Sequence, residues 1–414
     1  MVKMSNTVQT ILNCIRREVC EECQQTGEQK EVRREVEKKI VLSEFPACFF
    51  SELYRLSKAH DVAHLVGDAL SKCDTFNNLL DTTDENERAA IEKIKAKFEK
   101  QVVTAVYRYE NINYELEQLK QTLSEAEIPF IPLKGSVIRQ YYPEPWQRTS
   151  CDIDILVKPT DADNASKILA DRLQYTIKEK GQHDISLFSP SGIHVELHFK
   201  LVDLDFKQVQ ILNDVWGGNE VELVSENEYR MSNELFLLYH IYHTAKHFIH
   251  GGCGIKPFID LWVIKNKIGY DEAKVEKLLK ENGLLSFYNH AEELMDVWFE
   301  GKPHNDVTQK MENYILQGGV YGTLEQHVAM SQSKKGGRFA HLVSKIFLSY
   351  EQMKVYYPSV KKCPILFPFF QVRRWCRILF CGGRKTAMNE IKLNKNLSEE
   401  KKQTAKDLID ELGL

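Results

Sequence analysis

The run from 152 to 157, Asp-Ile-Asp-Ile-Leu-Val, constrains the fold of this chain more than any other segment. Acidic and aliphatic residues alternate with a period of two, as on a β-strand that buries one face. Asp152 and Asp154 would then point to the same side, about 6 to 7 Å apart along the backbone. Their repulsion favours a hard divalent cation such as Mg²⁺ between them. An edge strand whose acids face water would show the same pair, so the two aspartates alone leave both interpretations open.

A second feature precedes this strand. The short apolar run 128–133 is followed by Lys134, Gly135 and Ser136, which predicts a strand, a tight turn and a helix that extends to about Tyr142. A glycine and a serine at a helix start leave backbone N–H groups free for the phosphates of a nucleoside triphosphate. Lys134 could be a point charge on those phosphates, or a surface lysine whose stem covers apolar atoms.

A third carboxylate lies in the alternating segment 194–198, His-Val-Glu-Leu-His. Glu196 on a neighbouring strand would complete the acids that two-metal phosphoryl chemistry uses, with ions about 3.5 to 4 Å apart. His198 shares the strand face of Glu196, so it could contact substrate, hold the glutamate, or be an ordinary surface histidine. Arg148, just before the acidic strand, could clamp a phosphate or pair with an acid of the site.

The rest of the chain predicts an α+β fold. Apolar residues recur at helical spacing before and after the motifs, whereas the middle of the chain alternates. Besides 152–157, strands are expected at 128–133, 175–179, 184–188 and 193–201, with a helix over 161–173. We therefore expect a helical N-terminal lobe over 1–123, a small mixed β-sheet core over 124–230, and a helical C-terminal lobe over 231–414 that lines the cleft.

Together the motifs resemble a known family. Leu-Lys-Gly at 133–135, Tyr-Tyr-Pro at 141–143, Arg148 ahead of Asp-Ile-Asp-Ile-Leu-Val, and Val-Glu-Leu-His at 195–198 are similar to a largely uncharacterised bacterial nucleotidyltransferase family of the DNA polymerase beta-like superfamily. The resemblance covers residues 128–264 well and the C-terminal helices more weakly. Lys134 stands where the wider superfamily often has a second glycine, and the gap from Ser136 to Asp152 is long; both features fit the narrower family.

The resemblance implies an enzyme that moves a nucleoside monophosphate from a nucleoside triphosphate such as ATP to an acceptor, with release of pyrophosphate. Gly135 and Ser136 would bind the triphosphate. Asp152 and Asp154 would be ligands shared by two Mg²⁺ (or Mn²⁺) ions, and Glu196 would be the third ligand of the catalytic ion and could accept the proton of the attacking hydroxyl. No residue selects among small-molecule, sugar and peptide acceptors. The rival interpretation is a catalytically silent nucleotide-binding or interaction module on the same fold.

Four histidines follow at a spacing of three, four and three: His240, His243, His247 and His250. This spacing predicts one helix face that could hold zinc, could line the nucleotide cleft with His243 and His247 against phosphate or ribose, or could pack on the sheet. The lack of a cysteine or carboxylate at ligand spacing counts against zinc. The family resemblance suggests that Asp260 faces the same cleft.

The net charge and the spacing of the cysteines restrict the partners and the cell compartment that we expect. With 55 basic and 59 acidic side chains the chain has no overall attraction to nucleic acid, so we expect no nucleic-acid template. Its 10 cysteines form no regular framework, and Cys20 and Cys23 have no second pair for zinc, which favours reduced thiols in the cytoplasm. Nothing in the composition addresses the oligomeric state.

Membrane contact is expected to be peripheral at most. No apolar run reaches the about 20 residues that a membrane crossing needs, and the N-terminus lacks a signal peptide. The segment 367–380 interleaves aromatic residues with arginines and is followed by Arg384 and Lys385. It could contact an anionic membrane surface or a phosphorylated partner, or it could be a terminal helix that covers the core.

Overall fold

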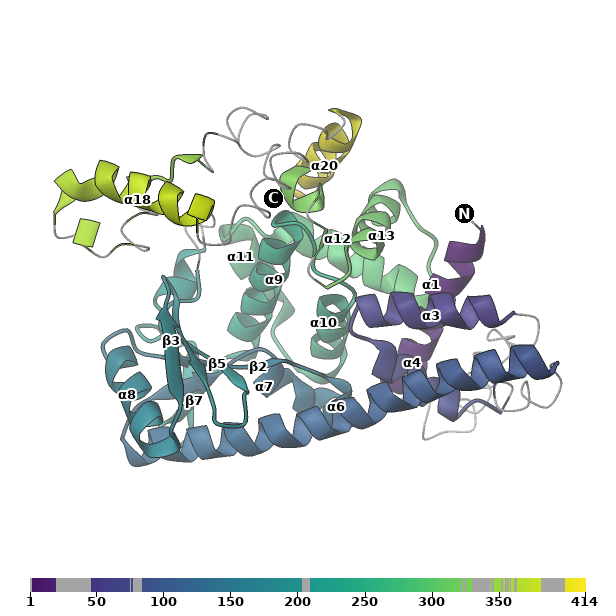
Figure 1. Cartoon of the computed structure of the whole chain (residues 1–414), viewed down its shortest axis with the longest axis horizontal. Helices are drawn as coiled ribbons and strands as arrows, with labels where there is room; N and C mark the ends of the chain where they lie inside the picture. Colours follow the sequence, from purple (N-terminus) through teal and green to yellow (C-terminus); the bar gives the residue numbers. More distant parts are fainter. Residues whose placement is uncertain are drawn as a thin grey trace. The chain divides into compact units, whose positions relative to one another are not determined.

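The N-terminal part of the protein is helical (Figure 1). The computed structural model describes residues 2–19, 46–74, 76, 84–202, 209–320, 322–323, 325–329 and 399–414, together with part of 343–380. Its first helices are α1 (Val2–Val19), α3 (Ala47–Ala59), α4 (Ala63–Ser71) and α6 (Glu85–Glu125). Helix α6 begins where the side chain of Asp84 accepts hydrogen bonds from the N–H groups of Asn86 and Glu87, which satisfies two donors that a helix start leaves free.

The strands form one mixed sheet in the described part of the chain. They are β1 (Phe130–Pro132), β2 (Asp152–Val157), β3 (Thr176–Lys180), β4 (Asp184–Phe188), β5 (His194–His198), β6 (Val221–Ser225) and β7 (Glu228–Met231). The 7-stranded sheet has the order β3-β4-β5-β2-β1-β7-β6. β2 pairs with β5, and β1 with β7, in parallel, whereas the other neighbours are antiparallel. The predicted α+β fold with a mixed sheet is therefore confirmed.

The hairpin of β6 and β7 was absent from the sequence prediction. Val221 is the only partly buried residue of β6, and the other four residues of that strand are exposed. A strand without a buried face has no alternation of apolar and polar residues to reveal it. The structure adds these two strands to the edge of the sheet beyond β1.

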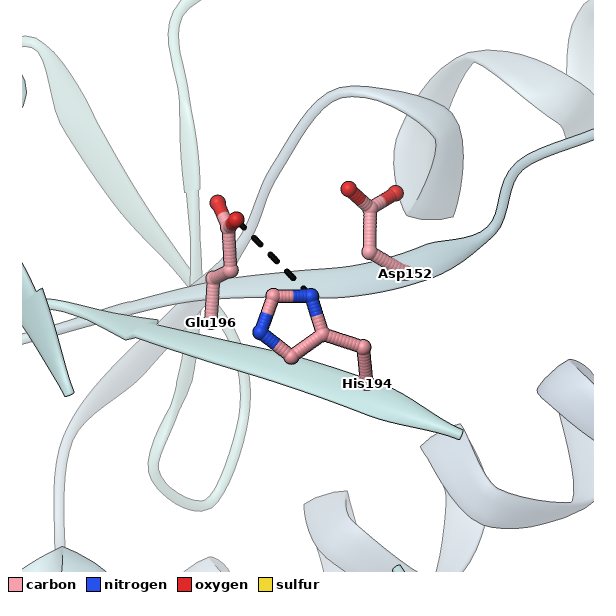
Figure 2. Close-up of side chains that lie close together, drawn as sticks. All are labelled: Asp152, His194 and Glu196. Atoms are coloured by element: carbon pink, nitrogen blue, oxygen red, sulfur yellow. Dashed lines mark ion pairs between the residues drawn. The ribbon is translucent and has the colours of Figure 1, made fainter. Parts of the chain in front are cut away.

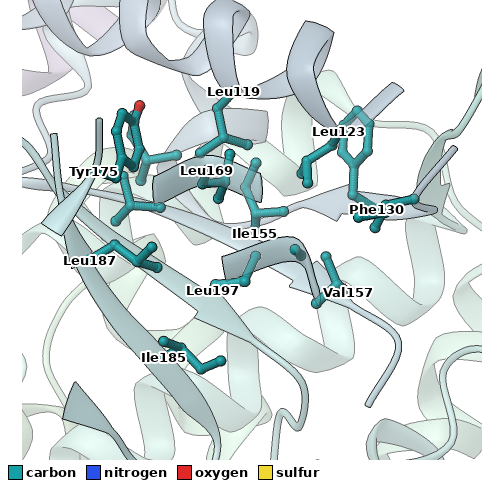
Figure 3. Packing of buried hydrophobic residues seen from close by; sticks show 14 of the residues in the cluster. Leu119, Leu123, Phe130, Ile155, Val157, Leu169, Tyr175, Ile185, Leu187 and Leu197 are labelled. Atoms are coloured by element: carbon teal, nitrogen blue, oxygen red, sulfur yellow. The ribbon is translucent and has the colours of Figure 1, made fainter. Parts of the chain in front are cut away.

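One face of the sheet is the hydrophobic core (Figure 3). Ile153, Ile155 and Val157 of β2 are fully buried there, and they pack with aliphatic side chains of β4, β5, α6 and α8 (Ala162–Leu173). Burying each such side chain stabilises the fold by about 1.5–3 kcal/mol. Because side chains alternate along a strand, burial of these three residues turns Asp152 and Asp154 to the opposite face.

Short elements join β1 to β2. Helix α7 (Gly135–Ile138) is followed by the 3₁₀ turns η3 (Arg139–Tyr141) and η4 (Pro145–Gln147). The predicted strand, turn and helix therefore lie where the apolar run and the glycine indicated. This connection carries Lys134, Ser136 and Arg148, so its conformation determines where their side chains lie.

Helices also follow the sheet. They are α9 (Asn233–Ile249), α10 (Lys256–Lys267), α11 (Glu272–Glu281), α12 (Leu285–Met295), α13 (Asp306–Gly318), α18 (Phe367–Phe380) and α20 (Glu399–Leu412), with short turns η6 (Gln210–Asn213), η7 (Asp296–Glu300) and η8 (Pro364–Leu366). The chain divides into two compact units, Met1–Tyr242 with Ile255–His304, and His243–Gly254 with Asn305–Leu414. The expected lobe boundaries stay a prediction.

The structure bears on the predictions about membrane contact and about segment 367–380, but not on those about Cys20 and Cys23. Among the described residues, no helix has the length and apolar content to cross a membrane. Segment 367–380 is helical, as α18, and its Arg373 and Phe370 are in cation–π contact. Cys20, Cys23, Arg384 and Lys385 lie outside the described residues.

The histidine of α4 ties the N-terminal helices to the connection before β2. His64 is 4% exposed, and its Nε2–H donates to the carbonyl oxygen of Gln147 at 2.7 Å. Burial lowers the pKa of this imidazole from its ordinary value of 6.5 to about 4. The neutral ring therefore contributes stability that is present above pH 6.5 and is lost as the pH falls through 6.5 towards 4.

We expect His64→Gln, which keeps an N–H donor, to flatten the acid limb of the stability curve. At pH 5 the buried neutral ring of the parent protein costs about 2 kcal/mol of stability relative to pH 7.5. The variant should lose about 2 kcal/mol less than the parent over that interval. Urea denaturation at both pH values measures the difference, and equal losses in the two proteins would show that His64 does not stay neutral in the fold.

Candidate functional site

The turn that begins α7 holds Lys134 in an unusual backbone conformation. The N–H of Ser136 donates to the carbonyl oxygen of Leu133 at 3.1 Å, and Lys134 between them has φ 46° and ψ −121°. These angles are those of the first central residue of a type II′ turn, where glycine is usual. A residue with a Cβ there costs about 1–3 kcal/mol. Lys134 therefore occupies a turn position that favours glycine, and its backbone there is strained.

The side chain of Lys134 reaches the acidic strand. Its Nζ lies 2.7 Å from Oδ1 of Asp154 and 4.0 Å from Oε2 of Glu196. Burial lowers the pKa of this ammonium group, but the carboxylate of Asp154 outweighs burial and the net pKa is raised. Lys134 therefore stays charged and neutralises Asp154 in this structure.

The carboxylates converge on the face of the sheet opposite the core. The parallel register places Asp152 beside His194 and Asp154 beside Glu196. Figure 2 shows Asp152, His194 and Glu196 approaching one another from the two strands. The structure thus brings together the three acids that the sequence analysis singled out.

Two histidines join the acids. His198 Nε2 lies 2.8 Å from Oδ1 of Asp154 and 3.3 Å from Oε2 of Glu196, and His194 Nδ1 lies 3.9 Å from Oε1 of Glu196. Two sets of possible metal ligands result, Asp152 with His194 and Glu196, and Asp154 with Glu196 and His198, each with its ligand atoms within 4.8 Å of one another. His194 was not predicted as a site residue, although it occupies the same strand face as Glu196.

Burial and charge shift the pKa values of these groups in opposite directions. Burial alone would raise the pKa of the Asp154 carboxyl, but Lys134 and His198 outweigh it and hold that pKa well below its ordinary value. Burial, followed by the charge of Asp154, raises the pKa of Asp152. Burial lowers the pKa of His198, but its hydrogen bonds to Asp154 and Glu196 raise it further than burial lowers it. The fold therefore favours the ionised form of Asp154 and disfavours that of Asp152.

Ser136 and Arg139 lie beside a cavity of about 360 Å³. The Oγ of Ser136 is buried and has no hydrogen-bond partner among the described residues. A buried hydroxyl without a partner costs about 1–3 kcal/mol, so such a group calls for a ligand or water. Arg139, which no sequence pattern distinguished, donates to the carbonyl oxygen of Gly135 at 2.6 Å and to Oγ of Ser150 at 2.8 Å. It fixes the turn to the residues just before β2.

Arg148 pairs with Asp260. Its Nε lies 2.7 and 2.8 Å from the two carboxylate oxygens of Asp260, and the hydroxyl of Tyr142 donates to Oδ1 at 2.6 Å. Asp260 is 2% exposed and belongs to neither of the two ligand sets. Of the two roles considered for Arg148, the contact seen here is the one with an acid, and that acid is the residue expected to face the cleft.

A second ion pair adjoins the first. Lys256 bonds to the carboxylate of Asp61 and lies 3.0 Å from Oγ1 of Thr149, whose hydroxyl donates to Asp61 at 3.0 Å. The partners come from three distant parts of the chain. These contacts anchor the residue next to Arg148, and so the approach to β2, to the N-terminal helices and to α10.

The four histidines near α9 do not form one set. His240 Nε2–H donates to the carbonyl oxygen of Pro257 at 2.8 Å, and His250 lies beyond the end of α9 with its Nδ1 bonded to the carbonyl oxygen of Lys246. His243 and His247 approach each other, with their Nε2 atoms 3.2 Å apart. Within the described residues, no group of three metal-ligating side chains includes any of them. A contact of His243 or His247 with phosphate or ribose stays a prediction.

The carboxylates of two neighbouring strands here offer the kind of ligands that divalent ions use in phosphoryl transfer. The family model described as "Uncharacterised nucleotidyltransferase" matches residues 50–300, which is more than half of the chain. The protein belongs to this family, so the resemblance drawn from the motifs is confirmed. A search of curated proteins and a search of solved structures found no match.

Proposed function

We propose that this protein is a metal-dependent nucleotidyltransferase that moves a nucleoside monophosphate from a nucleoside triphosphate to a small-molecule, sugar or peptide acceptor. The observation that carries the proposal is the register of β2 and β5, which sets Asp154 beside Glu196 on the face of the sheet opposite the core. Family membership supports the same type of transfer. Charge balance supports the absence of a nucleic-acid template.

The donor set fits a divalent cation. Three carboxylates and two imidazoles offer ligand atoms in two sets, each within 4.8 Å. Mg²⁺ or Mn²⁺ bound there would neutralise charge on the phosphates and on the attacking and leaving oxygens. Asp152 and Asp154 supply carboxylate oxygens for such a cation, and the strained backbone of Lys134 supports a functional role for this turn.

The proposed reaction forms one bond and breaks one. The hydroxyl oxygen of the acceptor bonds to the α-phosphorus, the bond from that phosphorus to the bridging oxygen breaks, and pyrophosphate leaves. Glu196 accepts the proton of the acceptor hydroxyl, while the backbone N–H of Gly135, the hydroxyl of Ser136 and the ammonium of Lys134 bind the phosphates. The N–H of Ser136, which the sequence analysis expected to be free, closes the turn onto Leu133 instead. The chain contributes positioning and fixed charge rather than a covalent intermediate.

Residues around the acids are proposed to position the acids and the substrate. His198 holds Asp154 and Glu196 through its Nε2, and Arg148 with Asp260 anchors the approach to β2. His243 and His247 are proposed to meet phosphate or ribose. The proposal for His243 and His247 rests on the sequence alone. Both residues belong to the second compact unit, separate from the first.

The test is turnover with a panel of triphosphates. Purified protein with Mg²⁺ or Mn²⁺ should release pyrophosphate when a competent acceptor from cell extract is present, and mass spectrometry should find the acceptor heavier by one nucleoside monophosphate. The double variant Asp152→Ala with Asp154→Ala should release none. Release of pyrophosphate that survives this double substitution would refute the proposal.

Lys134 gives a prediction that separates charge from backbone strain. Lys134→Gln and Lys134→Gly both remove the ammonium, so each should lower kcat/KM by about 100-fold. Only the glycine variant accepts φ 46° without strain, so it should be more stable than the glutamine variant by about 1–3 kcal/mol. Pyrophosphate release and urea denaturation measure the two effects. Equal stability of the two variants would show that the turn is not strained at this residue.

A silent module is the second candidate function, and the Lys134–Asp154 ion pair favours it. An ammonium at 2.7 Å already neutralises the acid that a cation would otherwise bind. Titration calorimetry distinguishes the two: an enzyme of the proposed type should bind triphosphate only with a divalent ion, and a silent module should bind it equally well without one, or not at all.

A further inference from the structure

Glu196 lies between two imidazoles on the face of the sheet opposite the core. His194 and His198 are its neighbours two positions away along β5, so all three side chains leave the strand on the same side. Across the parallel register, His194 faces Asp152 and Glu196 faces Asp154. Each carboxylate of β2 thus has both Glu196 and one imidazole within reach.

The separations around His198 are those of ligands on one ion. Its Nε2 lies 2.8 Å from Asp154 Oδ1 and 3.3 Å from Glu196 Oε2. Two donor atoms that bind one cation at about 2.1 Å, at right angles, are roughly 3 Å apart. Replacing the proton on Nε2 with a cation therefore requires little movement of His198, but the ammonium of Lys134, 2.7 Å from the same Oδ1 of Asp154, must move aside.

The ring of His194 is oriented by its other neighbours. Its Nε2 is 2.7 Å from Oγ of Ser186, and Phe188 stacks on the ring with centroids 4.8 Å apart and an angle of 26° between the planes. With Nε2 bonded to the serine, Nδ1 is directed to the side of Glu196, as Figure 2 shows. Histidines that bind metals usually donate the N–H of their far ring nitrogen to a second group, and the hydroxyl of Ser186 can accept such a bond from Nε2.

We propose that His194 and His198 are metal ligands, and that the site binds a pair of divalent transition-metal ions that share Glu196. One ion takes Asp152, Glu196 and His194, and the other takes Asp154, Glu196 and His198. This extends the proposed function, on which it rests for its chemistry. It reassigns the shared ligand from the two aspartates to Glu196, which then acts as a bridging ligand rather than as the acceptor of the hydroxyl proton.

The imidazoles determine which ion is preferred. Mg²⁺ takes oxygen ligands and keeps several waters, whereas imidazole nitrogen favours ions such as Co²⁺ and Zn²⁺. A set of two carboxylates and one imidazole resembles in composition the mixed nitrogen and oxygen sets of transition-metal enzymes. The site should therefore take transition-metal ions in preference to Mg²⁺, even where both support turnover.

The experiment is a direct titration of the metal-free full chain with Co²⁺ and, separately, with Mg²⁺, followed by calorimetry and by the visible spectrum of Co²⁺. We expect the Kd for Co²⁺ to be at least about 100-fold below that for Mg²⁺. His198→Gln and His194→Ala should each raise the Kd for Co²⁺ by about 10- to 100-fold and change the Kd for Mg²⁺ by less than about threefold. Circular dichroism checks folding, and the half-buried His194 offers the variant least apt to disturb it.

The matched control is His243→Ala with His247→Ala. The Nε2 atoms of this pair are 3.2 Å apart and could chelate Co²⁺ by themselves. The double variant should keep the Co²⁺ spectrum that His194→Ala and His198→Gln weaken. Loss of that spectrum in the control, or Co²⁺ affinity in the two site variants equal to that of the parent, would overturn the inference.

Failure of this inference is distinguishable from failure of the proposed function. Pyrophosphate release with Mg²⁺ that is unaffected by His194→Ala and His198→Gln, together with unchanged Co²⁺ binding, overturns the imidazole ligands and leaves the enzyme proposal intact. Binding of Co²⁺ that needs both histidines, without turnover of any triphosphate, supports the metal site and removes the enzyme proposal.

Discussion

Asp154→Asn is expected to lower kcat for pyrophosphate release by about 1000-fold or more, because it removes the carboxylate that the fold holds ionised. Lys134 and His198 both bond to Asp154, and both keep its pKa low against burial. An amide of the same shape can still accept hydrogen bonds from them, so the fold should persist. Steady-state release of pyrophosphate, with circular dichroism as a check on folding, measures the effect.

The matched control is Asp184→Asn. Asp184 lies on β4 on the same face of the sheet, in register with His198, but it belongs to neither ligand set. The substitution Asp184→Asn should change kcat by less than about fivefold, because Asp184 is not a proposed metal ligand. Comparable losses in the two variants would indicate that negative charge across the whole face, rather than the acids of β2 and β5, supports turnover.

The face on which the acids lie was predictable from the sequence. A period of two in 152–157 and in 194–198 fixes which side chains share a side of each strand, because the pleat leaves no alternative once Ile153 and Val195 are buried. The parallel pairing of β2 with β5 could not be predicted in the same way. Strand pairing depends on contacts far apart in sequence, for which a single chain carries no local signal.

Contacts between distant residues account for what the sequence analysis missed. The pair of Lys256 with Asp61 joins residues 195 positions apart, and the pair of Arg148 with Asp260 joins residues 112 apart. Lys134 was considered as a phosphate ligand, but its contact with Asp154 depends on a turn whose backbone angles only the structure provides. Local periodicity predicted strands, helices and the shared face, whereas ion pairing required the fold.

Arg148→Met is expected to destabilise the protein by about 3–5 kcal/mol, because it leaves the buried carboxylate of Asp260 without its cation. Burial lowers the pKa of Arg148, but Asp260 outweighs it and raises the net pKa, so the guanidinium stays charged in the fold. The hydroxyl of Tyr142 remains as a donor to Asp260, and it is too weak to replace a full charge. Urea denaturation of the parent and the variant measures the free energy of unfolding.

The double variant Arg148→Met with Asp260→Asn shows whether the loss comes from the stranded charge. An asparagine can still accept the hydrogen bond of Tyr142 and carries no charge, so the double variant should recover at least about 2 kcal/mol of what Arg148→Met loses. Additive losses in the two single variants would mean that the residues act separately and that the pair does not anchor the approach to β2. Because Thr149 and Ser150 follow directly and bond to Asp61 and Arg139, a pair that does anchor this segment also sets where Asp152 and Asp154 begin their strand.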